Sequence, residues 1–90
     1  MSVRHVTTDH ATIRRWVEAR GAHPATVTGV PGENGLLRLD LPGGYSGQEF
    51  LQPVSWEDFF ARFEREELAF VYEDDGRFWQ LVPRATTHRA

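Results

Sequence analysis

Histidine, serine and acidic side chains offer this chain few combinations that could do catalytic chemistry. Gly44-Tyr45-Ser46-Gly47 approaches the spacing of a nucleophile elbow, but Gln48 stands where that turn needs glycine. The chain has no cysteine, no phosphate-binding glycine loop, and no metal-ligand spacing among its histidines, which are His5, His10, His23 and His88. We therefore expect no enzyme activity, no metal site and no cofactor.

Acidic residues gather in two places that have simpler explanations than acid–base catalysis. Glu73-Asp74-Asp75 lies at a predicted hairpin tip without the spacing of a calcium loop, so we interpret these residues as solvated turn acids. Asp58 is expected to help cap a helix, and the other carboxylates between residues 57 and 67 lie on the polar side of that helix. A catalytic pair needs a partly desolvated cleft, and nothing in this pattern builds one.

Arginine provides all ten basic residues, and 13 acidic residues give a net charge of −3. That balance argues against a dedicated binder of long nucleic acid, which usually carries a basic face. Arg14, Arg15 and Arg20 nevertheless cluster on one predicted helix, where they could contact phosphate together with Arg38. A nucleic-acid-associated accessory protein is therefore an alternative function, although a solvated helix face explains the cluster more simply.

A second alternative is a small-ligand or carbohydrate binder. It would use Tyr45 and Trp79, whose rings could stack on a flat ligand. The spacing of Trp16, Trp56 and Trp79 instead places the tryptophans on predicted core faces.

The best-specified element is a helix that begins after Ser55, whose hydroxyl can accept a hydrogen bond from the first helical turn. Its aromatic residues follow the i, i+3, i+4, i+7 spacing of one buried stripe, formed by Trp56, Phe59, Phe60 and Phe63. Everything else in the chain is expected to bury that stripe.

An earlier helix is predicted over residues 9–20, where Gly21 suits the left-handed conformation that ends many helices. Residues 24–28 and 36–41 predict one hairpin. Residues 68–73 and 78–82 predict another, because Asp75-Gly76 suits a two-residue turn and would place Tyr72 opposite Trp79.

The predicted element order is α-β-β-α-β-β. We expect an α+β, two-layer fold, with a four-stranded, mainly antiparallel sheet and two helices on one face. One domain is expected over residues 7–84, with an N-terminal extension over residues 1–6 and a flexible C-terminal tail over residues 85–90. Residues 8–16 can be laid over residues 55–63, with Ile13 on Phe60, so duplication and convergence both stay open.

One face of the predicted sheet has no helix to cover it. Its apolar residues are Leu36, Ala69, Val71, Phe78 and Val82. An uncovered apolar sheet face usually contacts a partner. The function predicted first is therefore a non-catalytic protein-interaction or accessory module, whose partner is another protein or a second copy in a homodimer.

Location is predicted from what the sequence lacks. No apolar run approaches the roughly 20 residues of a membrane span, and the N-terminus has no apolar signal-peptide core. We expect no membrane contact and, for a cysteine-free chain, a cytoplasmic location.

Segments spread over residues 7–84 carry a resemblance to other proteins. They are residues 7–10, 13–16, 24–27, 39–43, 55–60, 68–72 and 78–82. Together they resemble a family of small, acidic, uncharacterised bacterial and archaeal proteins. Similar proteins are sometimes labelled glucan-branching enzymes, but that catalysis needs a barrel of about 250 residues. The resemblance therefore implies no activity and no site residues.

Overall fold

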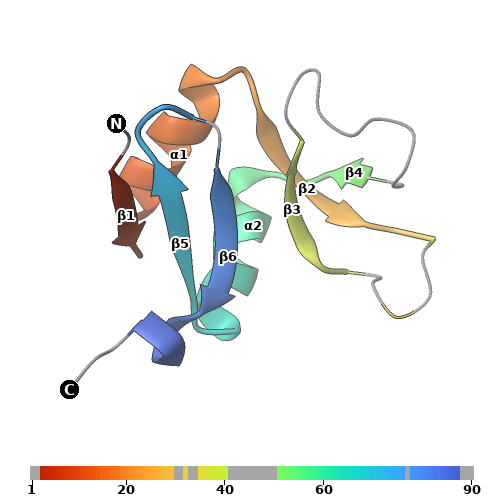
Figure 1. Cartoon of the computed structure of the whole chain (residues 1–90). Helices are drawn as coiled ribbons and strands as arrows, with labels where there is room; N and C mark the ends of the chain where they lie inside the picture. Colours follow the sequence, from red (N-terminus) through yellow and green to blue (C-terminus); the bar gives the residue numbers. More distant parts are fainter. Residues whose placement is uncertain (1–2, 30–31, 33–34, 41–50, 77, 88–90) are drawn as a thin grey trace.

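Two short antiparallel sheets and two helices make up the fold in a computed structural model, which describes residues 3–29, 32, 35–40, 51–76 and 78–87 (Figure 1). The elements in chain order are β1 (Arg4–Thr7), α1 (His10–Ala19), β2 (His23–Val27), β3 (Leu37–Asp40), β4 (Leu51–Pro53), α2 (Trp56–Arg65), β5 (Leu68–Glu73), β6 (Trp79–Pro83) and the 3-10 helix η1 (Arg84–Thr87). The α+β class expected from the sequence is confirmed.

The expected four-stranded sheet is replaced by two sheets of three strands. Sheet A has the order β1-β5-β6, and sheet B has the order β3-β2-β4. The two predicted hairpins do form, with Tyr72 opposite Trp79 as the turn predicted, but they do not join each other. Each hairpin instead pairs with a short strand that the sequence pattern did not mark: β1 beside β5 and β4 beside β2.

The described elements repeat as two β-α-β-β units that exchange their first strands. β1 of the first unit pairs with β5 of the second, and β4 of the second pairs with β2 of the first, both antiparallel. A constant offset of 46 positions relates the helices, from the N-caps Asp9 and Ser55 to the C-caps Arg20 and Glu66. The sequence alignment placed the first cap one residue early, at Thr8, so Ile13 corresponds to Phe59 rather than Phe60.

Both helices begin and end in the same way. The Asp9 carboxylate accepts from the Thr12 N–H, and the Ser55 hydroxyl oxygen accepts from the Asp58 N–H. After each C-cap comes a residue with positive φ, Gly21 at 70° and Glu67 at 52°. Glu67 adopts this left-handed conformation without the steric freedom of glycine.

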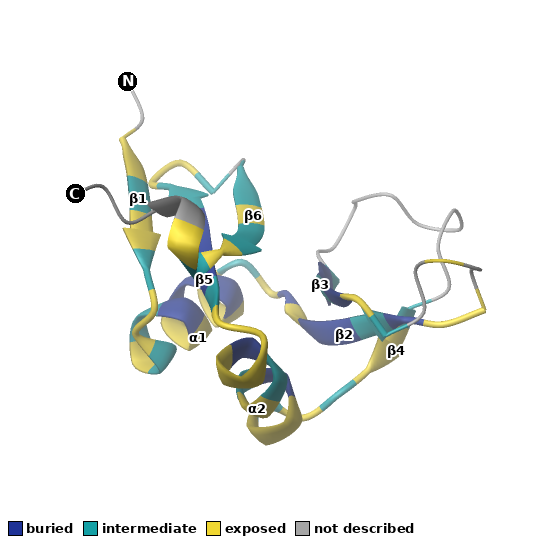
Figure 2. Cartoon of the chain, turned by 90° about the horizontal axis from the view of Figure 1, so that it is seen from below, coloured by how far each residue is buried: buried dark blue, intermediate teal, exposed yellow. Residues whose placement is uncertain are grey.

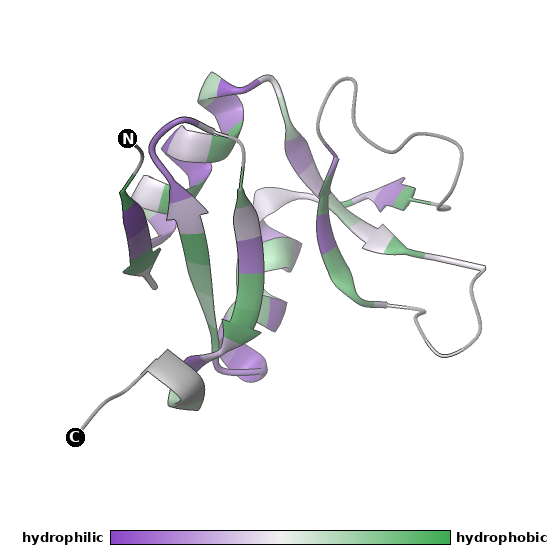
Figure 3. Cartoon of the chain, in the orientation of Figure 1, coloured by the Kyte–Doolittle hydropathy of each residue, from purple (hydrophilic) through white to green (hydrophobic). Residues whose placement is uncertain are grey.

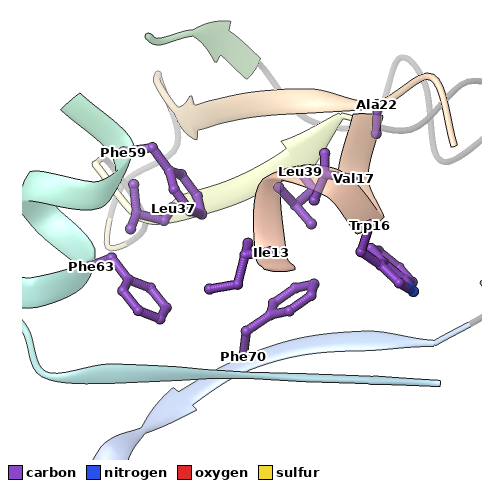
Figure 4. Packing of buried hydrophobic residues seen from close by; sticks show 9 residues of the cluster. All are labelled: Ile13, Trp16, Val17, Ala22, Leu37, Leu39, Phe59, Phe63 and Phe70. Atoms are coloured by element: carbon purple, nitrogen blue, oxygen red, sulfur yellow. The ribbon is translucent and has the colours of Figure 1, made fainter. Parts of the chain in front are cut away.

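A single apolar core lies between the two helices and the two sheets. Four of its fully buried members come from equivalent positions of the two helices, Ile13 with Phe59 and Val17 with Phe63. The other buried members are Trp16, Ala22, Leu37, Leu39 and Phe70 (Figure 4). Both helices lie on one face of sheet A, and sheet B flanks them, so the buried residues face inward from every side (Figure 2).

The predicted ends of the domain also take part in the fold. Residues 4–6 of the expected N-terminal extension belong to β1, and residues 85–87 of the expected tail belong to η1, which contacts β5 and β6. Residues 88–90 lie outside the described residues.

Truncating the buried Phe59 side chain of α2 should destabilise the protein more than truncating the adjacent Phe60 side chain. Phe59→Ala is expected to lower the free energy of unfolding by about 3–5 kcal/mol, because it leaves a cavity at a fully buried position. Phe60→Ala should lower the free energy of unfolding by clearly less, since Phe60 is only half-buried. Urea unfolding followed by tryptophan fluorescence measures both, and equal losses would contradict this assignment of the core.

Candidate functional site

A group of chemically capable side chains lies along the seam between α1 and α2. We call this group the interhelical seam. α1 contributes His10, Arg14 and Glu18, each four residues apart, and α2 contributes Trp56, Phe60 and Glu64 at the same spacing. His10 at the start of α1 meets Glu64 near the end of α2, and Glu18 meets Trp56, so the helices run antiparallel here.

A ring nitrogen contacts a carboxylate at each end of the interhelical seam. His10 Nε2 lies 2.7 Å from Glu64 Oε2, and Trp56 Nε1 donates to Glu18 Oε2 at 3.2 Å. These two contacts are equivalent under the 46-residue offset. The repeat therefore uses one geometry twice, with imidazole in one unit and indole in the other.

Glu64 is the electrostatic centre of the interhelical seam. The hydrogen bond from His10 lowers the pKa of the Glu64 carboxyl, and Arg84, whose Nη2 lies 3.3 Å from Glu64 Oε1, lowers it further. The His10 ring stacks on Phe60 with the centroids 4.0 Å apart, and Arg84 Nε donates to the Leu68 carbonyl at 3.0 Å. A histidine beside a carboxylate can move a proton, but here both partners are engaged in tying α1, α2 and η1 together.

The arginine cluster predicted to contact phosphate is divided among separate partners. Arg14 Nε lies 3.0 Å from Glu18 Oε2. Arg20 donates to the carbonyls of Trp16 and Asp74 at 3.0 and 3.1 Å, and its guanidinium lies over the Trp16 ring. Arg15 is exposed on the helix. The structure therefore uses Arg20 to join α1 to the β5–β6 turn and does not assemble the three guanidinium groups into one site.

The predicted partner surface does not form one continuous sheet face. Ala69 and Val71 are buried in sheet A, Phe78 and Val82 are half-buried there, and Leu36 precedes β3 of sheet B. The 3-10 helix η1 contacts β5 and β6 at one end of sheet A (Figure 1). It includes residues 85–87, which were expected to belong to a tail.

The sequence analysis did not name two exposed valines, one in β1 and one just before it, among the partner-surface residues. Val3 is 54% exposed and Val6 is 52% exposed, and Val6 lies opposite Val71 in the β1–β5 pair. Figure 3 shows apolar colouring on β1, β5 and the end of β6. The only signal in the sequence is the pair of valines itself, which could form a short edge segment.

The remaining predicted sites have plain structural positions. In the acidic tip, Glu73 pairs with Arg4 at 2.8 Å and Asp74 with His5 at 2.6 Å. Trp79 is half-buried and packs against the core. Tyr45, Ser46 and His88 lie outside the described residues. Within the described ranges, no three or more His, Cys, Asp or Glu side chains are placed to hold a metal ion.

A hollow beside α2 was not predicted from the sequence. It has a volume of about 250 Å³, and its lining residues are Thr26, Val54, Asp58, Ala61, Arg62 and Arg65. The signal that could have indicated it is the i, i+4, i+7 spacing of Asp58, Arg62 and Arg65, which places their side chains on one face of α2.

Comparison with known proteins adds no family or function. No protein-family model, curated protein or solved structure matches the chain. Among the described residues, no helix has the length and apolar character needed to cross a membrane.

Ionisation of Glu64 should make the folding stability of the protein depend on pH. A carboxyl whose pKa is lower in the folded state than its ordinary value of 4.5 stabilises the fold above that value, and the contribution is lost as pH falls through the folded pKa. Glu64→Gln should therefore cost less than about 1 kcal/mol at pH 7, as expected for a solvent-exposed pair, and the cost should shrink as pH falls below 4.5.

Urea midpoints measured between pH 3 and 7 test this expectation. Glu66→Gln is the matched control, because Glu66 is an exposed glutamate that follows the same helix. A loss for Glu64→Gln that stays constant across the pH range would show that its ionisation does not contribute.

Proposed function

We propose that the chain is a non-catalytic protein-interaction module that acts as a homodimer through β1 and the outer face of sheet A. The observation that supports this most strongly is the exposure of Val6, which is 52% exposed in a terminal strand of sheet A, with Val3, 54% exposed, just before that strand. Val6 and the half-buried Val82 lie in the two outer strands of this sheet and provide the apolar surface that a protein interface needs.

Strand β1 is suited to pair with a second copy of itself. In sheet A it is a terminal strand, so the described strands pair it on one side only, with β5. An edge strand presents unpaired backbone N–H and C=O groups to any other strand. Antiparallel pairing of two β1 strands satisfies both copies by the same contacts, as a two-fold symmetric interface requires, and extends two three-stranded sheets into one.

Groups at this edge limit which partners fit. Arg4 pairs with Glu73 and lies with its guanidinium 4.3 Å from the centre of the Phe78 ring, so its charge is compensated within the chain. His5 Nε2 lies 2.6 Å from Asp74 Oδ1. A second copy meets an edge at which the charge of Arg4 is already compensated, which lowers the repulsion between identical strands. A cysteine-free sequence supports a cytoplasmic setting for this module.

An acidic residue at the centre of the proposed interface should separate the copies. Val6→Asp is expected to raise the dimer dissociation constant at least about tenfold, which corresponds to about 1.4 kcal/mol. The change should leave the monomer folded, because Val6 is exposed. Sedimentation equilibrium over a range of concentrations measures the constant, and circular dichroism checks the fold.

Leu36→Asp is the matched control, since Leu36 is 46% exposed but adjoins the other sheet. It should leave the dissociation constant unchanged. A wild-type chain that stays monomeric at every concentration, or equal effects of the two substitutions, would overturn the proposal.

A further inference from the structure

The hollow beside α2 has the composition of a small binding site. Thr26 comes from β2, Val54 joins β4 to α2, and the other four lining residues follow one face of α2. The hollow thus lies between a helix and sheet B, apart from the valines of sheet A. Val54 and Ala61 provide apolar surface, and the remaining four residues provide polar groups.

The polar groups of the hollow are not neutralised by one another. Arg62 Nη1 donates to the Gly35 carbonyl, which orients its guanidinium. Within the described part of the chain, the Arg65 and Asp58 side chains take part in no ion pair or hydrogen bond. Two guanidinium groups and one carboxylate leave the lining with a net positive charge. Cations near a helix C-terminus are favoured by the helix dipole, but that preference does not require a hollow in front of them.

The equivalent space in the other half of the fold, between α1 and sheet A, is filled by side chains. With the offset of 46 residues, Arg62 corresponds to Trp16 and Thr26 corresponds to Tyr72. Trp16 and Tyr72 contact each other with ring centroids 5.7 Å apart, and Trp16 is 8% exposed. An aromatic pair therefore fills the space between α1 and sheet A, whereas an arginine and a threonine line a hollow between α2 and sheet B.

From this difference we infer that the hollow binds a small oxyanion, the carboxylate or phosphate group of a metabolite-sized ligand. Guanidinium groups bind such oxygens through paired N–H donors, and Arg62 is already oriented by Gly35. Arg65, one turn further along α2, provides the second cation. Asp58 lies in the same lining and repels a bare anion, so it selects ligands that carry a donor group beside the anionic one.

Titration of the ¹⁵N-labelled full chain with inorganic phosphate and, separately, with acetate tests the inference. Ionic strength is held constant with chloride. Saturable shifts are expected at the amides of Thr26, Ala61 and Arg65 by about 10 mM of at least one probe, since a site of millimolar affinity is then nearly filled. The probe that saturates at lower concentration distinguishes a phosphate site from a carboxylate site.

Three variants make the test specific. Arg65→Gln should weaken binding at least about tenfold, and Asp58→Asn should strengthen it by removing a like charge. Arg15→Gln is the matched control, an exposed arginine on the other helix, and should leave the affinity unchanged. No saturable shift with either probe, or equal weakening by Arg65→Gln and Arg15→Gln, would overturn the inference.

Discussion

The exchange of one strand between the two β-α-β-β units is the constraint on which the rest of the structure depends. Neither hairpin forms a three-stranded sheet from its own unit, because β5–β6 needs β1 and β2–β3 needs β4. The helices then bury their stripes in one core that draws on both units. Loss of either exchanged strand exposes part of that shared core, so the units are expected to unfold together. The β1 edge and the hollow beside α2 are both formed by this arrangement of strands and helices.

Local signals explain why much of the fold was predictable. The caps at Ser55 and near Asp9, the stop at Gly21 and the Asp75-Gly76 turn each act over a few residues, and the structure confirms both helices and both hairpins. The strand exchange has no such signal. β1 and β4 are four and three residues long, and pairs such as Thr7 with Phe70 are distant in sequence. Periodicity cannot indicate which hairpin a strand that short will join.

Candidate site residues were harder to predict, because the chain uses its basic groups to hold the fold. Arg20 covers Trp16, Arg84 lies near Phe63, and Arg4 covers Phe78. A planar guanidinium can stack on a ring and still donate to carbonyls, so an arginine cluster in the sequence does not by itself indicate a phosphate site. The burial of Ala69 and Val71 could likewise not be predicted from the sequence. The alternation of apolar and polar residues predicts which face of a sheet a residue takes, but not what covers that face.

Differences between the two repeated units indicate where function lies. A position that only supports the fold has no reason to change character between units that fold alike, and the pairs Ile13–Phe59 and Val17–Phe63 obey this rule. By strand register the counterpart of Val6 is Pro53, because Val6 pairs with Val71 and Pro53 pairs with Ala25. β1 therefore keeps a backbone N–H at a position where β4 has a proline, which cannot donate to a further strand. On the helices, Arg62 departs from Trp16 toward charge. One unit therefore supplies an apolar edge suited to a protein partner, and the other supplies a charged hollow suited to a small anion.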